Sequence, residues 1–317
     1  MREPQKLALL IPAYNAAAFL PRLLASAAKQ TTPFEEIWVY DDCSTDNTSE
    51  IATRFGARVV RGDVNRGCSH GKNVLAAQTE AEWIHFHDAD DELLPNFVSL
   101  ARQWMERGEF DVVLFSYEER DDETGGLLAI RHFDPDDVRR DARSYAIREQ
   151  INPFCGLYRR EAFLGAGGYD EDPEVLYNED VAMHLRLAFA GLTFAVEPAV
   201  SIINHRRASS MSSANRSKCF RAQLAVMRKA SQLPQSEPYR GAIAKNLWGI
   251  AGCLAAELDW THADSAAKLA LHLGGVRSVP SGGPFRLVAA ISPSMALRFR
   301  EHAIRIGKPQ LRLSYPR

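Results

Sequence analysis

Two aspartates, Asp88 and Asp90, stand directly after a short apolar run, residues 83–86, in this chain of 317 residues. The run is rich in aromatic and β-branched side chains, which is typical of a buried strand. If the strand continued through the pair, both carboxylates would lie on the same side, since side chains alternate along a strand. Like charges at that spacing favour a cation between them. The alternative is a solvated acidic turn, so the rest of the chain must decide.

Other polar side chains that could take part in chemistry also follow apolar runs. Residues 7–11 are followed by Tyr14 and Asn15, and residues 37–40 by Asp41 and Asp42. Helical patterns separate these runs, and Asn15 is expected to cap the first helix. The alternation predicts an α/β fold with a parallel, right-handed wound sheet, in which ligands bind at the carboxyl ends of the strands. The three polar strand ends therefore predict one binding site.

The later part of the chain is less regular. Residues 112–115, 153–158, 194–196 and 200–203 read as short strands, and the charged stretch 118–143 as a hairpin or mobile loop. From about residue 216 onward the pattern is helical. We therefore expect a wound domain over residues 1–215 and a helical region over residues 216–317.

Composition excludes several classes of protein. Hydrophobic residues make up 46% of the chain and charged residues 25%, with a formal net charge of −2, which does not suggest a nucleic-acid partner. The five cysteines are scattered without a C-x-x-C spacing, which indicates free thiols rather than a zinc site or disulfides. With no apparent signal peptide and no apolar run of membrane-spanning length, we expect a soluble, cytoplasmic protein.

The motifs resemble, in order and spacing, those of the family 2 glycosyltransferases with a GT-A fold. The resemblance covers about residues 5–212 and is carried by residues 11–15, 40–48, 65–67, 72–73, 87–91 and 177–180. Cys43 departs from the family, which usually has glycine there, and Lys72 stands where arginine is common. The resemblance implies a Rossmann-like, mostly parallel sheet flanked by helices, with a helical C-terminal extension.

The resemblance also implies a site for a nucleotide-sugar, with a UDP-sugar as the first candidate. Asp42 would accept a hydrogen bond from the base, whereas Asp41 would contact the nucleotide or orient its loop. Tyr14 is either a stacking or a packing residue, and Arg66 and Lys72 either balance donor charge or lie on a solvated helix face. The nucleotide-binding residues are expected to be Pro12, Ala13, Tyr14, Asn15, Asp41, Asp42, Arg66, Lys72, Asp88 and Ala89.

A divalent cation, Mn²⁺ or Mg²⁺, is implied at the two aspartates, because charge develops on the departing diphosphate. Asp90 is the expected direct ligand, together with Asp88. Asp91 is either another contact or a cap for the next helix. His205, in a basic loop at residues 205–212, is implied as a third ligand, the alternative being a structural histidine.

The carboxylates Glu179 and Asp180 are the implied catalytic residues. The family inverts the anomeric centre by direct displacement, which needs a base for the acceptor hydroxyl, and Asp180 matches that base. Helix capping is the alternative role for this pair. The acceptor would be a hydroxyl of a glycan or lipid-linked glycan.

The last helical region leaves several options open. Ordinary packing against the catalytic domain is the default, but an apolar stripe with arginines beside it could also contact the inner face of the plasma membrane. Acceptor binding and homo-oligomerisation are further options. The stripe consists of Met295, Phe299, Ala303 and Ile306, with Arg298, Arg300 and Arg305 nearby.

Other functions fit the sequence less well than sugar transfer. A dinucleotide-binding dehydrogenase is disfavoured, because no G-x-G-x-x-G follows the first strand. The remaining rival is a catalytically silent, glycosyltransferase-like nucleotide-binding or scaffold subunit, against which the intact Asp88, Asp90 and Asp180 argue.

Overall fold

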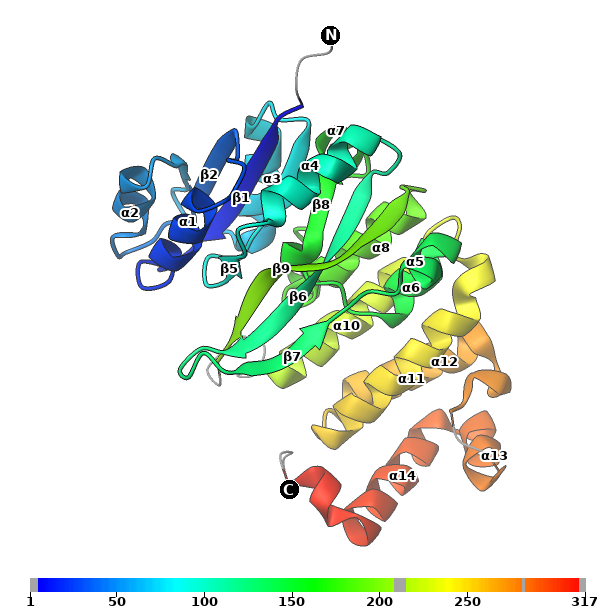
Figure 1. The fold of residues 1–317 in the computed structure, drawn as a ribbon. Helices are drawn as coiled ribbons and strands as arrows, with labels where there is room; N and C mark the ends of the chain where they lie inside the picture. The colour runs from blue at the N-terminus through cyan, green and yellow to red at the C-terminus, as the bar shows by residue number, and fades with distance from the viewer. Residues whose placement is uncertain (1–4, 208–214, 281–282, 314–317) are drawn as a thin grey trace. The chain divides into compact units, whose positions relative to one another are not determined.

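The N-terminal apolar run forms the middle of a parallel group of strands (Figure 1). The computed structural model describes residues 5–207, 215–280 and 283–313. Strand β1 (Leu7–Ala13) pairs in parallel with β2 (Glu36–Asp41) and β4 (Trp83–Phe86), and β3 (Arg58–Arg61) pairs in parallel with β2. Residues 7–11 are fully buried, as expected for a strand covered on both faces. The predicted parallel, wound arrangement is confirmed for these four strands.

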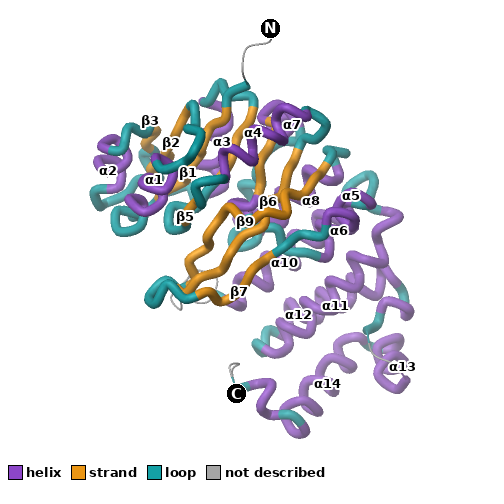
Figure 2. Tube along the Cα trace, in the orientation of Figure 1, coloured by secondary structure: helices purple, strands orange, loops and turns teal. Residues whose placement is uncertain are grey.

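Beyond β4 the sheet becomes mixed (Figure 2). Its order is β3-β2-β1-β4-β8-β6-β9-β5, with β7 paired to β6. Strand β8 is antiparallel to both of its neighbours, whereas β6 and β9 are parallel to each other. The strands of this half are β5 (Glu92–Leu93), β6 (Val112–Asp121), β7 (Leu127–Arg131), β8 (Gly156–Arg159) and β9 (Phe194–Arg206).

Two local expectations are settled in this half of the sheet. The charged stretch 118–143 contains the predicted hairpin, since β6 and β7 pair antiparallel. The two strands expected at 194–196 and 200–203 are instead one strand, β9, whose pairing with β6 shifts register between Phe115 and Tyr117. Such an irregularity bends a strand without ending it, which is why the sequence reads as two pieces.

The helices that accompany the sheet follow the predicted pattern, with one correction. Helix α1 begins at Leu20 with Pro21 in its first turn, and its N-cap is Phe19 rather than the predicted Asn15. Asn15 has a positive φ of 48° and is used elsewhere. The helices are α1 (Leu20–Ala28), α2 (Thr48–Arg54), α3 (Cys68–Gln78), α4 (Phe97–Arg107), α5 (Pro135–Arg140), α6 (Ala142–Arg148) and α7 (Arg160–Gly165).

Helix α3 packs closely on β2 at Tyr40, which is 4% exposed. A Cβ atom at Gly71 would lie 2.6 Å from the Tyr40 ring, and one at Gly62 would lie 2.6 Å from its hydroxyl. The close approach therefore requires glycine at position 71, although glycine inside a helix lowers helix stability.

The chain separates into two compact units. Unit 1 contains Met1–Tyr145, Ile151–Glu171 and Arg186–Ser210, and unit 2 contains Ala146–Gln150, Asp172–Leu185 and Met211–Arg317. The sheet belongs to unit 1. Helix α8 (Glu179–Phe189) begins in unit 2 and ends in unit 1.

Unit 2 is built mainly from helices, as predicted for residues 216 onward. Helix α11 supplies a buried apolar side, and α12 meets it with Ala263, Ala266 and Ala267, whose small side chains permit close approach. None of the helices within the described residues is both long and apolar enough to cross a bilayer. The helices are α10 (Arg216–Ala230), α11 (Arg240–Ala256), α12 (Trp260–Gly274), α13 (Gly283–Ile291) and α14 (Pro293–Gly307). Short 3-10 turns are η1 (Pro153–Cys155), η2 (Pro173–Val175), η3 (Glu237–Tyr239), η4 (Val276–Ser278) and η5 (Pro309–Arg312).

Candidate active site

The loops that follow β1 and β2 are tied together at the carboxyl edge of the sheet. Ala13 accepts a hydrogen bond from the Asp42 amide at 2.9 Å. The Asn15 side chain accepts one from the Thr45 amide at 2.9 Å, and the Asn15 amide donates to the Ser44 hydroxyl at 2.9 Å. Asn15 therefore joins the two loops instead of capping a helix.

Asp41 is fully buried, and its carboxylate holds its own loop. One oxygen accepts from the Ser44 amide at 2.8 Å, and the other accepts from the Ser49 hydroxyl and lies 3.3 Å from Arg61. Burial alone would raise the pKa of Asp41, but these hydrogen bonds and the Arg61 charge together lower it below its usual value. These contacts correspond to the loop-orienting role that the sequence left open.

Asp42 holds the next loop of the site. Its two oxygens accept hydrogen bonds from the amides of Arg66 and Gly67, at 2.8 and 2.7 Å. Each carboxylate oxygen can accept a further bond, so a base N–H remains chemically possible at Asp42. The Arg66 side chain is exposed, whereas its backbone is fixed by Asp42.

Cys43 lies between these loops in a left-handed conformation, with φ of 63°. Its thiol is 3.4 Å from the carbonyl oxygen of Asp63. Glycine adopts this φ without the Cβ penalty of other residues, so the backbone conformation accounts for the glycine that the family usually has at this position.

Tyr14 is 53% exposed, while the neighbouring Ala13 is buried. A tyrosine that served packing alone would be covered. The exposed ring is thus available to a ligand at this edge.

Asp88 and Asp90 lie in a turn, which corrects the strand-based expectation. Strand β4 ends at Phe86, and the Asp91 amide donates to the Asp88 carbonyl at 3.2 Å. The positions of the two carboxylates are therefore set by this turn and not by the alternation of side chains along a strand. Each carboxylate has different partners.

Asp88 faces Lys72, a buried cation on α3. The Lys72 ammonium is 3.6 Å from the Asp88 carboxylate and 5.0 Å from the centre of the Tyr169 ring. Lys72 is only 1% exposed, which rules out the solvated helix face that the sequence allowed for it. A buried lysine needs a negative partner, so Asp88 and Lys72 stabilise each other.

Asp90 is held by two arginines. Arg207, just after β9, forms a close ion pair with the Asp90 carboxylate, and Arg22 of α1 donates to the Asp90 carbonyl. Asp122 lies 2.6 Å from Arg22 and 3.8 Å from Arg207. The Arg207 guanidinium also stacks 4.0 Å above the Phe19 ring.

Asp91 does not cap the next helix, whose N-cap is Asn96. It is 1% exposed, and its carboxylate accepts from the Asn204 side chain at 2.9 and 3.0 Å and from the His205 amide at 2.9 Å. Burial, followed by the charges of Asp90 and Asp88, raises the pKa of Asp91 well above its usual value. Asp91 therefore fixes the end of β9 beside the aspartate turn.

His205 is placed among acidic side chains at the same edge. Its Nε2 is 3.2 Å from Glu92, and its Nδ1 is 3.6 Å from Asp122. Burial and the Arg22 charge lower its pKa, against the opposing effect of Glu92 and Asp122. The rest of the basic loop, from residue 208, lies outside the described residues.

The two histidines of β4 and its end form a buried pair. His85 Nδ1 lies 2.8 Å from the Gly156 carbonyl oxygen, and His85 Nε2 lies 3.0 Å from His87 Nδ1. Burial lowers the pKa of His85 to about 4 and that of His87 well below its usual value, so both rings are neutral. Among the described atoms, His87 Nε2 has no hydrogen-bond partner.

The donor chemistry of the aspartate turn fits a hard divalent cation. Both carboxylates are about one third exposed, at 36% of the side chain each. Within the described part of the chain, no group of three or more histidine, cysteine or acidic side chains is arranged to hold a metal ion. Two aspartates that leave most of a coordination shell open suit Mg²⁺ or Mn²⁺ bound together with phosphate oxygens and water.

Glu179 and Asp180 belong to unit 2, in the first turn of α8. Each is 9% exposed. The Asp180 carboxylate accepts from the Val181 amide at 2.9 Å, and the Asp180 carbonyl oxygen is 2.8 Å from His184 Nδ1. The bond from the Val181 amide fits the capping role.

Three residues of the unit 1 site were missed from the sequence. Arg22, Glu92 and Asp122 all contact predicted residues, yet none lies within a motif that carries the family resemblance. Glu92 lies on β5 and Asp122 directly after β6, and the pairing of β9 with these two strands, which no local pattern predicts, brings them to His205.

The fold is that of the GT-A glycosyltransferases. The first 349 residues of S. aureus TarS, solved in complex with UDP-GlcNAc, superpose with a TM-score of 0.72 at 18% identity, over 95% of this chain and 92% of that chain. A mannosyltransferase, PcManGT of Pyrobaculum calidifontis, solved with GDP-Man and Mn²⁺, gives a TM-score of 0.60 at 19% identity, over 96% of this chain and 81% of that one.

Sequence similarity places the chain within this class. Residues 8–164 match the profile of Glycosyl transferase family 2, and the chain belongs to that family. An uncharacterized glycosyltransferase of Haemophilus influenzae is 34% identical over 28% of this chain and 31% of its own length. Glycosyltransferase GlyG of Streptococcus pneumoniae is 29% identical over 38% of this chain and 42% of its own length. The chain thus spans less than half the length of these relatives.

Proposed function

We propose that this protein transfers a sugar from a nucleoside diphosphate sugar to a hydroxyl of a glycan or lipid-linked glycan. The observation that carries the proposal is the aspartate turn, where Asp88 and Asp90 stand beside Lys72 and Arg207 at the ends of parallel strands. Carboxylates for a metal and cations for phosphate are the groups that a diphosphate leaving group requires. A UDP-sugar is the first donor to test, and TarS has been solved with UDP and UDP-GlcNAc.

The donor is proposed to lie along the edge formed by β1, β2 and β4. The exposed Tyr14 ring would contact the base or ribose near Pro12, Ala13 and Asn15. Asp42 would accept from the base, and Asp41 would act through the loop that it holds. The exposed Arg66 would add positive charge.

The diphosphate is proposed to bind at residues 88–90 with a divalent cation. Asp88 and Asp90 would hold the metal, with His205 as a further candidate ligand, and the metal would neutralise charge on the leaving group. A cation held by Asp90 would supply the positive charge that Arg207 provides there in this structure. Arg207 could then pair with phosphate, which its planar fork suits.

Asp180 is proposed as the base of an inverting displacement. As the acceptor oxygen attacks the anomeric carbon, its proton passes to the Asp180 carboxylate and the bond to the donor phosphate breaks. Because the departing diphosphate is already a good leaving group, no protein acid is needed. Glu179 would assist by contacting the acceptor or the sugar.

A thermal-shift screen tests donor binding first. Nucleoside diphosphates and nucleotide-sugars are added with and without Mn²⁺ or Mg²⁺, and a bound ligand raises the melting temperature. We expect UDP or UDP-sugars to raise the melting temperature only when the metal is present. The Asp90→Asn variant should show no such increase. If no nucleotide shifts the wild-type protein under any metal condition, the silent scaffold becomes the better description.

Replacing the proposed base separates binding from chemistry. Asp180→Asn should lower kcat by about 10²- to 10⁴-fold while the nucleotide thermal shift is retained, because only proton transfer is lost. Glu237→Gln, which removes an exposed carboxylate of unit 2, is the control and should leave kcat unchanged. Wild-type turnover in Asp180→Asn would disprove the assignment.

We further propose that residues 1–215 carry donor binding and chemistry, while residues 216–317 include a surface for an anionic membrane. The supporting observation is the exposure of apolar side chains on α13 and α14, where Ile291 is 88%, Phe299 62% and Ile306 70% exposed. Arginines 298, 300 and 305 lie on the same helix, α14. This composition suits attachment to the inner face of the plasma membrane.

A further inference from the structure

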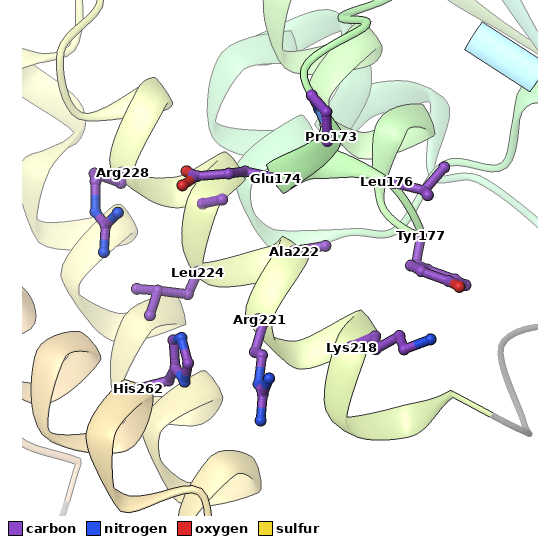
Figure 3. A pocket seen from close by; sticks show the side chains of 11 residues that line it. Pro173, Glu174, Leu176, Tyr177, Lys218, Arg221, Ala222, Leu224, Arg228 and His262 are labelled. Atoms are coloured by element: carbon purple, nitrogen blue, oxygen red, sulfur yellow. The ribbon is translucent and has the colours of Figure 1, made fainter. Parts of the chain in front are cut away.

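Unit 2 contains a pocket of about 330 Å³ that the proposed donor site does not use (Figure 3). Its walls come from η2 and the residues after it, from α10, and from α12. The lining residues are Pro173, Glu174, Leu176, Tyr177, Lys218, Arg221, Ala222, Leu224, Ala225, Arg228 and His262.

The pocket is cationic. Lys218, Arg221 and Arg228 line it from α10, whereas Glu174 is the single carboxylate in its lining (Figure 3). Arg221 is engaged by Asp259 at 2.6 Å. Lys218 and Arg228 form no ion pair with any carboxylate of the described residues, and the hydrogen bond of Arg228 is to the Ser265 hydroxyl at 3.4 Å. Two cations are therefore left to interact with a ligand.

The spacing of these cations favours an extended anion. Lys218 and Arg228 are ten residues apart on one helix, which separates their backbones by about 15 Å. In Figure 3 the two side chains lie at opposite ends of the pocket, which suits an anion longer than a single phosphate. A chain that carries negative charges at intervals can contact both, with Arg221 between them.

The remaining lining suits the carbon skeleton of such a chain. Leu176, Ala222 and Leu224 provide apolar walls. The Lys218 ammonium lies over the Tyr177 ring, 5.6 Å from the ring centre. A ligand in the pocket would therefore meet an aromatic face and a cation side by side. Phosphate groups joined by short polyol or sugar units combine these two requirements, since each unit offers an anion and aliphatic carbons.

The pocket is also close to the proposed base. Tyr177 precedes Asp180 by three residues and has a positive φ of 77°, which turns the chain directly before α8. Cys219, beside Lys218 on α10, has a thiol whose pKa is raised by burial first and also by the charges of Glu179 and Asp180. The carboxylates and the start of α10 are therefore neighbours within unit 2.

We propose that this pocket binds a phosphodiester-linked segment of the acceptor. The acceptor is then a chain of phosphate-joined polyol or sugar units, and Lys218, Arg221 and Arg228 hold its phosphates while one hydroxyl lies at Asp180. The last clause rests on the proposed function, whereas binding of the chain to the pocket does not.

The test is direct binding of a synthetic glycerol phosphate hexamer, measured by isothermal titration calorimetry on the full chain. We expect binding that weakens as salt is raised, and about tenfold weaker binding by Lys218→Gln/Arg228→Gln. Lys218→Arg/Arg228→Lys keeps both charges and should retain binding. The matched control, Lys245→Gln/Lys268→Gln, removes two exposed cations of α11 and α12 outside the pocket and should bind like wild type.

Further experiments distinguish an acceptor phosphate from a lipid headgroup, and this proposal from the proposed function. The UDP thermal shift should be the same in wild type and Lys218→Gln/Arg228→Gln, and a shift lost only in the variant would assign the pocket to the donor and overturn the proposal. Absence of the shift in the wild type as well would count against the proposed function alone. Binding to phosphatidylglycerol vesicles should also be unchanged by this double substitution; a parallel loss would assign the pocket to lipid headgroups instead. Equal hexamer affinity in the pocket and control variants would overturn the proposal, as would tighter binding of a galacturonate hexamer.

Discussion

The aspartates of this site have two different roles. Asp41 and Asp91 are buried and hold backbone in place, whereas Asp88 and Asp90 remain partly exposed and are balanced by Lys72 and Arg207. Buried polar groups must find partners within the protein, so the first kind fixes the loops that present the second kind. This division explains why a short segment can contain so many like charges.

The buried His85 predicts how stability depends on pH. Its pKa falls from 6.5 in the unfolded chain to about 4 in the folded one, so the unfolded chain binds more protons between these values. The free energy of unfolding should therefore decrease as pH falls from 6.5 to 4, by on the order of 3 kcal/mol from this ring. Denaturant unfolding at a series of pH values measures this.

Two substitutions isolate the contribution of His85. His85→Phe removes the titrating group, so its stability should depend less steeply on pH in that window even though its absolute stability is lower. His272→Gln, at an exposed histidine of α12, should keep the wild-type slope. An unchanged slope in His85→Phe would show that other groups account for the dependence.

At this scale the sequence predicted which residues gather, but not their individual partners. Asp88 and Asp42 were expected at one edge because each follows a recognisable strand, whereas Lys72 was expected there only from the family resemblance. The pairing of Asp90 with Arg207 was not predictable, since Arg207 arrives through the non-local pairing of β9. The turn at residues 88–91 was considered only as the alternative to a continuing strand, because an apolar run gives no sign of where its strand ends.

Among the elements, α3 and β2 can pack closely only because Gly71 has no side chain. Gly71→Ala places a Cβ 2.6 Å from the Tyr40 ring, which is also confined near Gly62. Overpacking of this kind costs roughly 1–3 kcal/mol, against a gain in helix propensity of about 1 kcal/mol. We expect Gly71→Ala to lower the melting temperature.

Gly249→Ala in α11 is the matched control for this substitution. Its Cβ would meet nothing within 4 Å, and the position is exposed. It should gain stability by up to about 1 kcal/mol from helix propensity alone. Similar shifts for the two substitutions in thermal denaturation would refute the role given to the close contact.

Elements were predictable where local pattern and topology agree. The first four strands and their helices alternate regularly, so their parallel pairing followed from the sequence. The second half has no such regularity: β8 reverses direction, and β9 is one irregular strand that reads as two. Antiparallel insertion between parallel strands is a property of the tertiary fold, and no hydrophobic period encodes it.

For the whole molecule, the exposed apolar side chains of α13 and α14 predict membrane attachment. The protein should co-sediment with vesicles that contain phosphatidylglycerol and much less with neutral phosphatidylcholine vesicles, because both apolar and positive side chains contribute. Phe299→Asp/Ile306→Asp should reduce the bound fraction by tenfold or more, since burial of each side chain is worth about 1.5–3 kcal/mol.

The control places the same change in the other unit. Leu127→Asp/Leu128→Asp alters two exposed leucines of β7, at 56% and 57% exposure, and should leave vesicle binding intact. If both double variants lose binding equally, general hydrophobicity rather than this surface is responsible. Concentration-dependent sedimentation without vesicles would instead reveal self-association.

The buried histidine pair has a consequence for spectroscopy. His85 Nδ1 must donate to the Gly156 carbonyl, so its Nε2 is the acceptor and His87 Nδ1 carries the second proton. Each ring is thus locked as a single tautomer, and the bare nitrogen of His87 is one residue from Asp88. In a ¹⁵N-labelled sample the imidazole resonances of these two rings would show the signature of the Nδ1–H tautomer. They offer an internal reporter, needing no added probe, of what reaches the end of β4.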